Sequence, residues 1–353
     1  SRHLPVHAAG VVIAPGPLPD YVPVCTTPTK GAGQSAGGED VMITQYEMGA
    51  LEKVGMLKMD ILGLKTLTVI HDALAMIQAR HGTAPDLGVT TYDDPKVYEL
   101  LRQGRTAGVF QFASALATDT LRAMRCDRFD YLVATTALLR PGPLYAGMHT
   151  VFIRRKLGQE AVTYPHPSLK GILEPTYGVI TYQEQVMRIA NVLAGFSLAE
   201  ADVLRKAVGK KDEALIKQEV GRFVDRAMAQ GHPRRLAEEL GAQIETFGRY
   251  GFNKSHSVAY SVLSYQTAWL KAHYPAEFMA ALLSSEIGNT DKVVQYINEA
   301  RELGLEVMPP DVNESGFKFT VVGESRLRFG LGAIRNVGAG VIESMIEARR
   351  DGP

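Results

Sequence analysis

The period of the hydrophobic pattern changes near residue 63, and no other feature of the sequence constrains the fold as strongly. Apolar and polar residues alternate over residues 54–62, as they do in a strand with one buried face. Lys58 and Asp60 then share one face of this strand, opposite an apolar face. From residue 64 the spacing becomes helical, which predicts a helix that ends near Gly82. The apolar stripe of this helix consists of Leu67, Ile70, Leu74 and Ile77.

Helical signals dominate the middle of the chain. Ser197 and Glu200 have the spacing of a capping box, which predicts a helix that runs to about Val208 with Gly209 as its C-cap. Further helices are expected over about 211–231, after Pro233, between His256 and Pro275, and in two pieces over 278–304.

Strand signals lie nearer the two ends. Residues 6–14 are small and β-branched, which predicts a buried strand. Beyond Pro310 the chain becomes β-like over 317–322 and 327–329, before a Gly-rich turn and a final helix. The expected fold class is therefore α+β and mostly helical. Because the first residue is not Met and the last ones closely follow a predicted helix, we expect a piece of a longer protein.

The composition narrows the class of protein. Among 353 residues, 46% are hydrophobic and 22% are charged, as in a globular protein with a true core. No run approaches the ~20 apolar residues that span a bilayer, so we expect no membrane partner. Cys25 and Cys126 are the only cysteines and cannot form a disulfide framework, which favours a cytoplasmic location.

The charge is unevenly distributed, although the formal net charge is zero. Residues 140–260 hold 17 Lys and Arg against 12 Asp and Glu, so the rest of the chain is acidic. Such a basic middle can present a positive face to phosphate groups. Chance asymmetry on a solvated surface is the alternative interpretation.

The most distinctive motif is RYGFNKSHSVAY at residues 249–260, in a turn that opens a helix. It combines cationic, polar and aromatic side chains at a spacing that buried structure rarely needs. Such a mixture suits a ligand that carries both a phosphate and a flat ring, such as a nucleotide. The predicted binding residues in this motif are Tyr250, Asn253, Lys254 and His256.

Two basic segments are further candidates for phosphate binding. Arg140 directly precedes a Pro-Gly-Pro turn, which fixes its position and suits bidentate recognition of a phosphate. A second group lies around a predicted helix C-terminus, where cations also interact favourably with the helix dipole. Its members are Arg205, Lys206, Lys210 and Lys211.

Asp60 is a candidate metal ligand because Mg²⁺ prefers oxygen ligands and keeps water and substrate phosphates in its shell. Lys58 on the same face could neutralise a phosphate. An ordinary exposed Asp–Lys pair explains the window equally well. One carboxylate is also too few for phosphoryl transfer between two metal ions.

Eight segments, in order along nearly the whole chain, resemble the alpha subunits of bacterial DNA polymerase III, the C-family replicative polymerases. They are HAAGVVIA (7–14), KMDILGL (58–64), GVFQF (108–112), LRPGPL (139–144), YGVITYQEQVM (177–187), LRKAVGKK (204–211), YGFNKSHS (250–257) and WLKAHYPAEF (269–278). Eight such segments in the same order make the resemblance highly specific.

The resemblance implies a fold and a set of roles. Residues 1–68 would be part of a nucleotidyltransferase-type palm sheet, 69–305 the helical fingers, and 306–353 a segment leading toward a helix-hairpin-helix region. Asp60 would be one of three metal-binding aspartates in a site with two Mg²⁺ ions. Arg140 and the 250–257 turn would hold the triphosphate and base of a dNTP. The partners would be primer-template DNA and, through regions outside this sequence, the sliding clamp and other replisome subunits.

Two features depart from the family pattern. The other two aspartates form an Asp-x-Asp pair in the family, and this sequence contains no Asp-x-Asp. After GVFQF, residues 113–116 read ASAL where the family has Glu-Ser and then Gly-Met. We therefore expect a fragment of a DNA-directed DNA polymerase that is inactive alone. The alternative is a noncatalytic nucleotide- or DNA-binding module.

Overall fold

The computed structural model describes residues 9–27, 41–210, 213–248 and 251–351. It divides into two units, Ser1–Lys65 and Thr66–Pro353, which are described separately. The fold is α+β and mostly helical, as the sequence predicts.

The first unit contains two antiparallel strand pairs. Strand β1 (Gly10–Ile13) pairs with β4 (Leu57–Asp60), and β2 (Val24–Thr27) pairs with β3 (Val41–Thr44). The unit also contains η1 (Leu18–Asp20) and α1 (Met48–Lys53). A small core of Val22, Leu51 and Met56 holds it together. In the described part of this unit the strands form two separate two-stranded sheets.

The apolar face of the β1–β4 ribbon is exposed, which corrects the prediction of a buried strand over residues 6–14. The register places Val11 opposite Met59 and Ile13 opposite Leu57. All four side chains lie on one face, and Leu57 is 57% exposed. The small core packs instead against the opposite face through Val12. Residues 1–8 lie outside the described residues.

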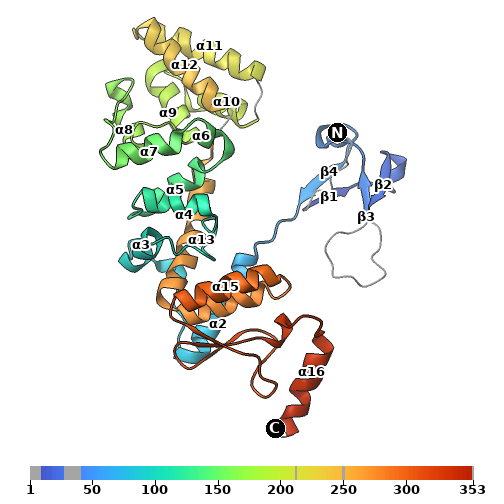
Figure 1. The fold of residues 1–353 in the computed structure, drawn as a ribbon. Helices are drawn as coiled ribbons and strands as arrows, with labels where there is room; N and C mark the ends of the chain where they lie inside the picture. Colours follow the sequence, from blue (N-terminus) through green and yellow to red (C-terminus); the bar gives the residue numbers. More distant parts are fainter. Residues whose placement is uncertain (1–8, 28–40, 211–212, 249–250, 352–353) are drawn as a thin grey trace. The chain divides into compact units, whose positions relative to one another are not determined.

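The second unit is built mainly from helices (Figure 1). They are α2 (Lys65–His81), α3 (Pro95–Arg102), α4 (Ala115–Ala123), α5 (Phe129–Leu138), α6 (Pro141–Tyr145), α7 (Met148–Lys156), α8 (Lys170–Leu173), α9 (Gln183–Ala194), α10 (Leu198–Lys210), α11 (Glu213–Ala229), α12 (Arg234–Gly248), α13 (Lys254–His273), α14 (Pro275–Ser285), α15 (Thr290–Glu302) and α16 (Ala339–Ala348). Short 3-10 turns are η2 (Leu87–Val89), η3 (Pro167–Leu169), η4 (Glu174–Thr176), η5 (Leu331–Ala333) and η6 (Arg349–Asp351).

Helix α13 is the central element of this unit for the sites described below. It packs against α3, α5 and α14 (Figure 1). Buried hydroxyls fix its register on α5, because Ser257 Oγ donates to the carbonyl of Val133 at 2.6 Å and Ser261 Oγ lies 3.4 Å from Thr136 Oγ1. Sliding α13 along α5 would leave these polar atoms unpaired.

Most of the predicted helices are confirmed, including the α2 end beside Gly82 and the Ser197–Glu200 capping box. Two local predictions are wrong. Helix α10 continues through Gly209 to Lys210. The stripe residue Leu67 is exposed, whereas Val69 and Ala73 are buried together with Ile70 and Ile77.

A three-stranded sheet follows the helices. Strand β7 (Arg326–Arg328) lies between β5 (Glu306–Met308), which is parallel to it, and β6 (Thr320–Val322), which is antiparallel. The sheet packs against α14 and α15, so that Phe319 and Leu327 share a core with Ile70 and Phe278. Strand β5 was not predicted, since its three residues are too short for a period to be read.

The start of α3 gives a pH-dependent prediction. Burial raises the pKa of Asp94, but hydrogen bonds from His273 (2.7 Å) and from the Lys96 N–H (2.8 Å) outweigh it, and the net pKa lies below its ordinary value. A lowered carboxyl pKa stabilises the fold above about pH 4, and this contribution is lost as the pH falls further.

We therefore expect Asp94→Asn to lower the free energy of unfolding by about 1 kcal/mol at pH 7. Asparagine also caps helices, so the change tests mainly the charge. Urea unfolding at pH 7 and at pH 3 measures the effect. Equal losses at the two pH values would contradict the prediction.

Candidate functional site

The motif at residues 249–260 opens helix α13, as expected, and the backbone N–H groups of Lys254 and His256 are already hydrogen-bonded. Asn253 is the N-cap, and its side chain accepts a hydrogen bond from the His256 N–H at 2.9 Å. The Lys254 N–H donates to the carboxylate of Glu184 at 3.0 and 3.1 Å. A phosphate at this place must therefore be held mainly by side chains. Tyr250 lies outside the described residues.

Arg140 reaches the same motif from helix α6. The predicted Pro-Gly-Pro turn is instead a short helix with Arg140 as its N-cap and Pro141 at the first position, where proline is preorganised. The guanidinium carbon lies 4.5 Å from the centre of the Phe252 ring. Burial lowers the pKa of Arg140. Phe252 is itself fixed, because its carbonyl accepts from the Gln183 N–H at 3.0 Å.

Arg140 and His256 meet at a pocket of about 210 Å³. The centre of the His256 ring lies 5.4 Å from the centre of the Phe252 ring and 4.2 Å from that of Tyr260. These three neighbouring rings lie beside the Arg140 guanidinium. The remaining lining residues are Gln111, Phe112, Ser114, Leu116, Ala117, Thr135, Thr136 and Leu139. The arrangement offers a guanidinium, an imidazole and aromatic faces.

One wall of the pocket comes from the segment 108–112, which sequence reasoning did not assign to the site. Gly108 and Gln111 both have positive φ, of 77° and 66°, and the Phe110 N–H donates to Thr267 Oγ1 at 3.1 Å. With this backbone conformation, Gln111 is one of the residues that line the pocket. The GVFQF run was the available signal, but nothing in its residue types predicts a positive φ at a glutamine.

The departure at residues 113–116 lies at the same pocket. Ser114 caps helix α4 by accepting a hydrogen bond from the Ala117 N–H at 3.3 Å, and both Ser114 and Leu116 line the pocket. The lining residues in the described part of the chain include no carboxylate.

Lys254 does not line this pocket. Its ammonium nitrogen lies 5.5 Å from the centre of the Tyr182 ring instead. Of the predicted nucleotide-binding residues in the second unit, the structure thus brings together Arg140 and His256. It places Asn253 as a helix cap and Lys254 outside the pocket.

Lys58 and Asp60 lie in the first unit and form an ion pair at 2.5 Å on one face of β4, as the alternation predicts. The Lys58 side chain is 14% exposed and the Asp60 side chain 46%. Within the described residues, no three or more His, Cys, Asp and Glu side chains are grouped as a metal site requires. This part of the chain therefore does not fit Mg²⁺ by itself.

The other basic candidates have local partners. Lys206 and Arg205 both contact the Asp202 carboxylate, at 2.9 and 2.7 Å, and these bonds lower the pKa of Asp202. Arg205 and Lys206 lie before the last turn of α10. The favourable interaction of cations with the helix dipole is confined to the last turn, so it does not explain these two residues. The side chain of Lys210 and all of Lys211 lie outside the described residues.

Fold and pocket together define a class: a mostly helical α+β protein in which an arginine and three neighbouring rings meet at the start of a long helix. Three family models identify the class further. Residues 1–63 match the bacterial DNA polymerase III alpha NTPase domain, 66–231 match the bacterial DNA polymerase III alpha subunit finger domain, and 304–353 match a helix-hairpin-helix motif.

Curated relatives agree with these models. The chain is 49% identical over 360 residues to DNA polymerase III subunit alpha of Thermus aquaticus, with 100% of this chain and 28% of the relative covered. It is 47% identical over 350 residues to the Aquifex aeolicus protein of that name (99% and 29%), and 43% identical over 362 residues to that of Escherichia coli strain K12 (100% and 30%). The chain belongs to the bacterial DNA polymerase III alpha subunit family.

The chain spans less than a third of the length of these relatives. It corresponds to a fragment that contains the finger-domain match and parts on either side. None of the helices in the described ranges is both long and apolar enough to cross a membrane.

Proposed function

We propose that this chain holds the incoming deoxynucleoside triphosphate for template-directed DNA synthesis by a cytoplasmic replicative polymerase of which it is a part. In that reaction the primer 3′-hydroxyl attacks the α-phosphate and pyrophosphate leaves. The observation that carries the proposal is the pocket at which Arg140 and His256 meet beside Phe252 and Tyr260.

Each side chain has a distinct part in this proposal. Arg140 presents a planar guanidinium, which can donate two parallel hydrogen bonds to a phosphate. The rings of Phe252, His256 and Tyr260 offer faces and edges for stacking a base or sugar. The pocket of about 210 Å³ is smaller than the ~300–1,000 Å³ of complete small-molecule sites. It therefore takes one part of the nucleotide, and the rest extends toward primer-template DNA.

The other predicted residues act in the complete enzyme. Asp60 is proposed as one Mg²⁺ ligand there, with Lys58 beside it, and further carboxylates are needed to complete the metal site. Asn253, Lys254 and Tyr250 would support the nucleotide from the same turn. Arg205, Lys206, Lys210 and Lys211 are proposed to contact DNA phosphates. We also propose domain boundaries at residues 68 and 305. The sliding clamp and the other replisome subunits would bind the complete enzyme through regions outside this chain.

The pocket gives a direct test with dATP as the probe and isothermal titration calorimetry as the measurement. We expect Arg140→Gln to weaken dATP binding at least about tenfold, because a charge-assisted bidentate pair contributes about 1.5–3 kcal/mol. Arg140→Lys should recover only part of the loss, since an ammonium lacks the planar fork.

Arg234→Gln is the matched control, because that exposed arginine is paired with Glu238 on its own helix. Its affinity for dATP should be unchanged. Equal affinities of Arg140→Gln and the unaltered chain for dATP would refute the proposed pocket.

The alternative is a noncatalytic nucleotide- or DNA-binding module. The lack of a three-ligand metal cluster among the described residues favours it for the isolated chain. A primer-extension assay with added Mg²⁺ tests whether the isolated chain is catalytic. We expect no incorporation by this chain alone, and measurable Mg²⁺-dependent incorporation would contradict that expectation.

A further inference from the structure

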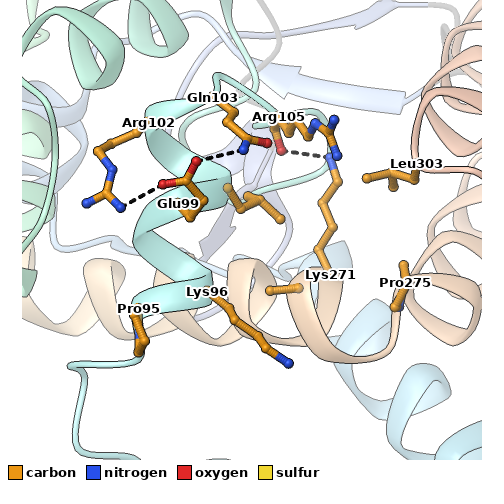
Figure 2. Close-up of a pocket in the computed structure, with 11 residues that line it drawn as sticks. Pro95, Lys96, Glu99, Arg102, Gln103, Arg105, Lys271, Pro275 and Leu303 are labelled. Carbon is orange, nitrogen blue, oxygen red and sulfur yellow. Dashed lines mark hydrogen bonds and ion pairs between the residues drawn. The ribbon is translucent and has the colours of Figure 1, made fainter.

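A second and larger pocket lies beyond the opposite end of α13 and shares no residue with the first. Its volume is about 570 Å³. Figure 2 shows its lining, which comes from α3 and the turn after it, from the end of α13 and the start of α14, and from Leu303. The lining residues are Pro95, Lys96, Glu99, Leu100, Arg102, Gln103, Arg105, Lys271, Ala272, Pro275 and Leu303.

The charge of this lining is predominantly positive. Its four cations are Lys96, Arg102, Arg105 and Lys271, and its one carboxylate is Glu99. Glu99 is already engaged, since it accepts hydrogen bonds from Arg102 and from Gln103, each at 2.7 Å (Figure 2). The side chains of Lys96 and Arg105 form no ion pair or hydrogen bond with any residue that the structure describes.

Lys271 gives the pocket a fixed inner wall. Its side chain is fully buried, and its ammonium group donates to the carbonyls of Arg105 and Ala107, each at 2.8 Å, and to Glu299. These three acceptors use all three N–H groups. Lys271 therefore does not grip a ligand directly but anchors the turn that carries Arg105.

An apolar surface accompanies the cations. Leu100, Ala272, Pro275 and Leu303 line the same pocket. Together they provide a surface against which a flat, weakly polar ring can lie. The volume falls in the range of sites that hold a complete small ligand, about 300–1,000 Å³.

We propose that this pocket binds one nucleotide unit, with one phosphate on Arg105, a neighbouring phosphate on Lys96 and the base against the apolar surface. The unit comes either from single-stranded DNA or from a free nucleotide, since both present the same phosphate and base. This site is separate from the Arg140 pocket and does not depend on the function proposed for it.

The test uses the 353-residue chain with Arg140→Gln already introduced, so that the first pocket is weakened. One probe is a fluorescein-labelled oligothymidylate of about 12 nucleotides, followed by anisotropy. The other is dTTP, followed by calorimetry. The test variant adds Lys96→Gln and Arg105→Gln. Its matched control adds Arg234→Gln and Arg235→Gln, two exposed arginines of α12.

We expect the test variant to lose at least about tenfold in affinity for one of the two probes, and the control to lose almost none. If the oligothymidylate is the probe affected, the slope of log K against log salt should also fall by about 1.4, or about 0.7 for each phosphate that is no longer neutralised. A loss with the oligothymidylate alone identifies single-stranded DNA, and a loss with dTTP identifies a free nucleotide.

The proposal fails if neither probe binds the chain that carries Arg140→Gln, or if test and control variants bind both probes equally. It also fails if circular dichroism shows that the test variant keeps its helices but both affinities are unchanged. The dATP titrations of Arg140→Gln test nucleotide binding at the first pocket independently of these results.

Discussion

Replacing Lys271 with methionine is expected to lower the free energy of unfolding by about 3 kcal/mol, one of the two largest single-residue effects predicted for this chain. Methionine fills a similar volume but removes the ammonium group. The carbonyls of Arg105 and Ala107 then lose their donor, and the carboxylate of Glu299 loses its cation. Removing one partner of a buried ion pair lowers stability by more than the pair itself contributes, because the remaining group is buried without a partner.

The measurement is urea unfolding followed by the fluorescence of Trp269, the only tryptophan, which precedes Lys271 by two residues on α13 and stacks on His273 at 4.5 Å. Lys292→Met is the matched control. Lys292 lies on α15, with its ammonium nitrogen 5.8 Å from the Tyr296 ring centre, and it should change stability by less than about 0.5 kcal/mol.

A double-mutant cycle separates the carboxylate from the carbonyls. Adding Glu299→Gln to Lys271→Met should restore part of the loss, because no unpaired charge then remains. If the two substitutions were strictly additive, the ion pair would contribute nothing and the expected mechanism would be wrong.

Gly178→Ala is expected to have an effect of similar size, about 3 kcal/mol, from two causes. The φ of Gly178 is +79°, a left-handed conformation that costs a residue with a Cβ about 1–2 kcal/mol. An added Cβ would also lie 2.5 Å from the Thr163 carbonyl oxygen, a backbone atom with little freedom to move. The neighbouring hydrogen bond from Arg155 Nη1 to the Tyr177 carbonyl, at 3.0 Å, restricts the loop further.

Gly158→Ala separates the two causes. Its φ is +71°, but an added Cβ would meet no atom within 4 Å. We expect a loss of about 1 kcal/mol for Gly158→Ala, as for the conformation alone. Urea unfolding followed by far-ultraviolet circular dichroism compares the two variants. If both variants lost the same free energy of unfolding, the close approach of the added Cβ to the Thr163 carbonyl oxygen would not contribute to the loss.

Local patterns predicted the elements well because their causes are local. The side chain of Asn253 caps the helix that it precedes, and Ser197 and Glu200 bond to each other's backbone. Alternation alone placed Lys58 and Asp60 on one face of a strand. In each case the interacting groups lie within a few residues, so the sequence window contains the whole interaction.

The pocket depends on partners that are distant in sequence and was predicted only in part. Glu184, 70 residues away in sequence, accepts a hydrogen bond from the Lys254 N–H at the start of α13, and no local pattern indicates this contact. Gln111 reaches the pocket through a positive φ that its residue type does not favour. Leu57 lies on the face predicted to be buried, because the small core formed on the opposite side of the ribbon.

Helix α13 carries residues that line both pockets. Its 20 residues extend about 30 Å, with His256 and Tyr260 at one pocket and Lys271 and Ala272 at the other. The segment from Arg105 to Phe112 runs beside it, bonded to Lys271 and Thr267. A single residue inserted between Tyr260 and Thr267 would turn one end of the helix by about 100° against the other. A change in the length of this interval is therefore expected to alter the orientation of one pocket lining relative to the other.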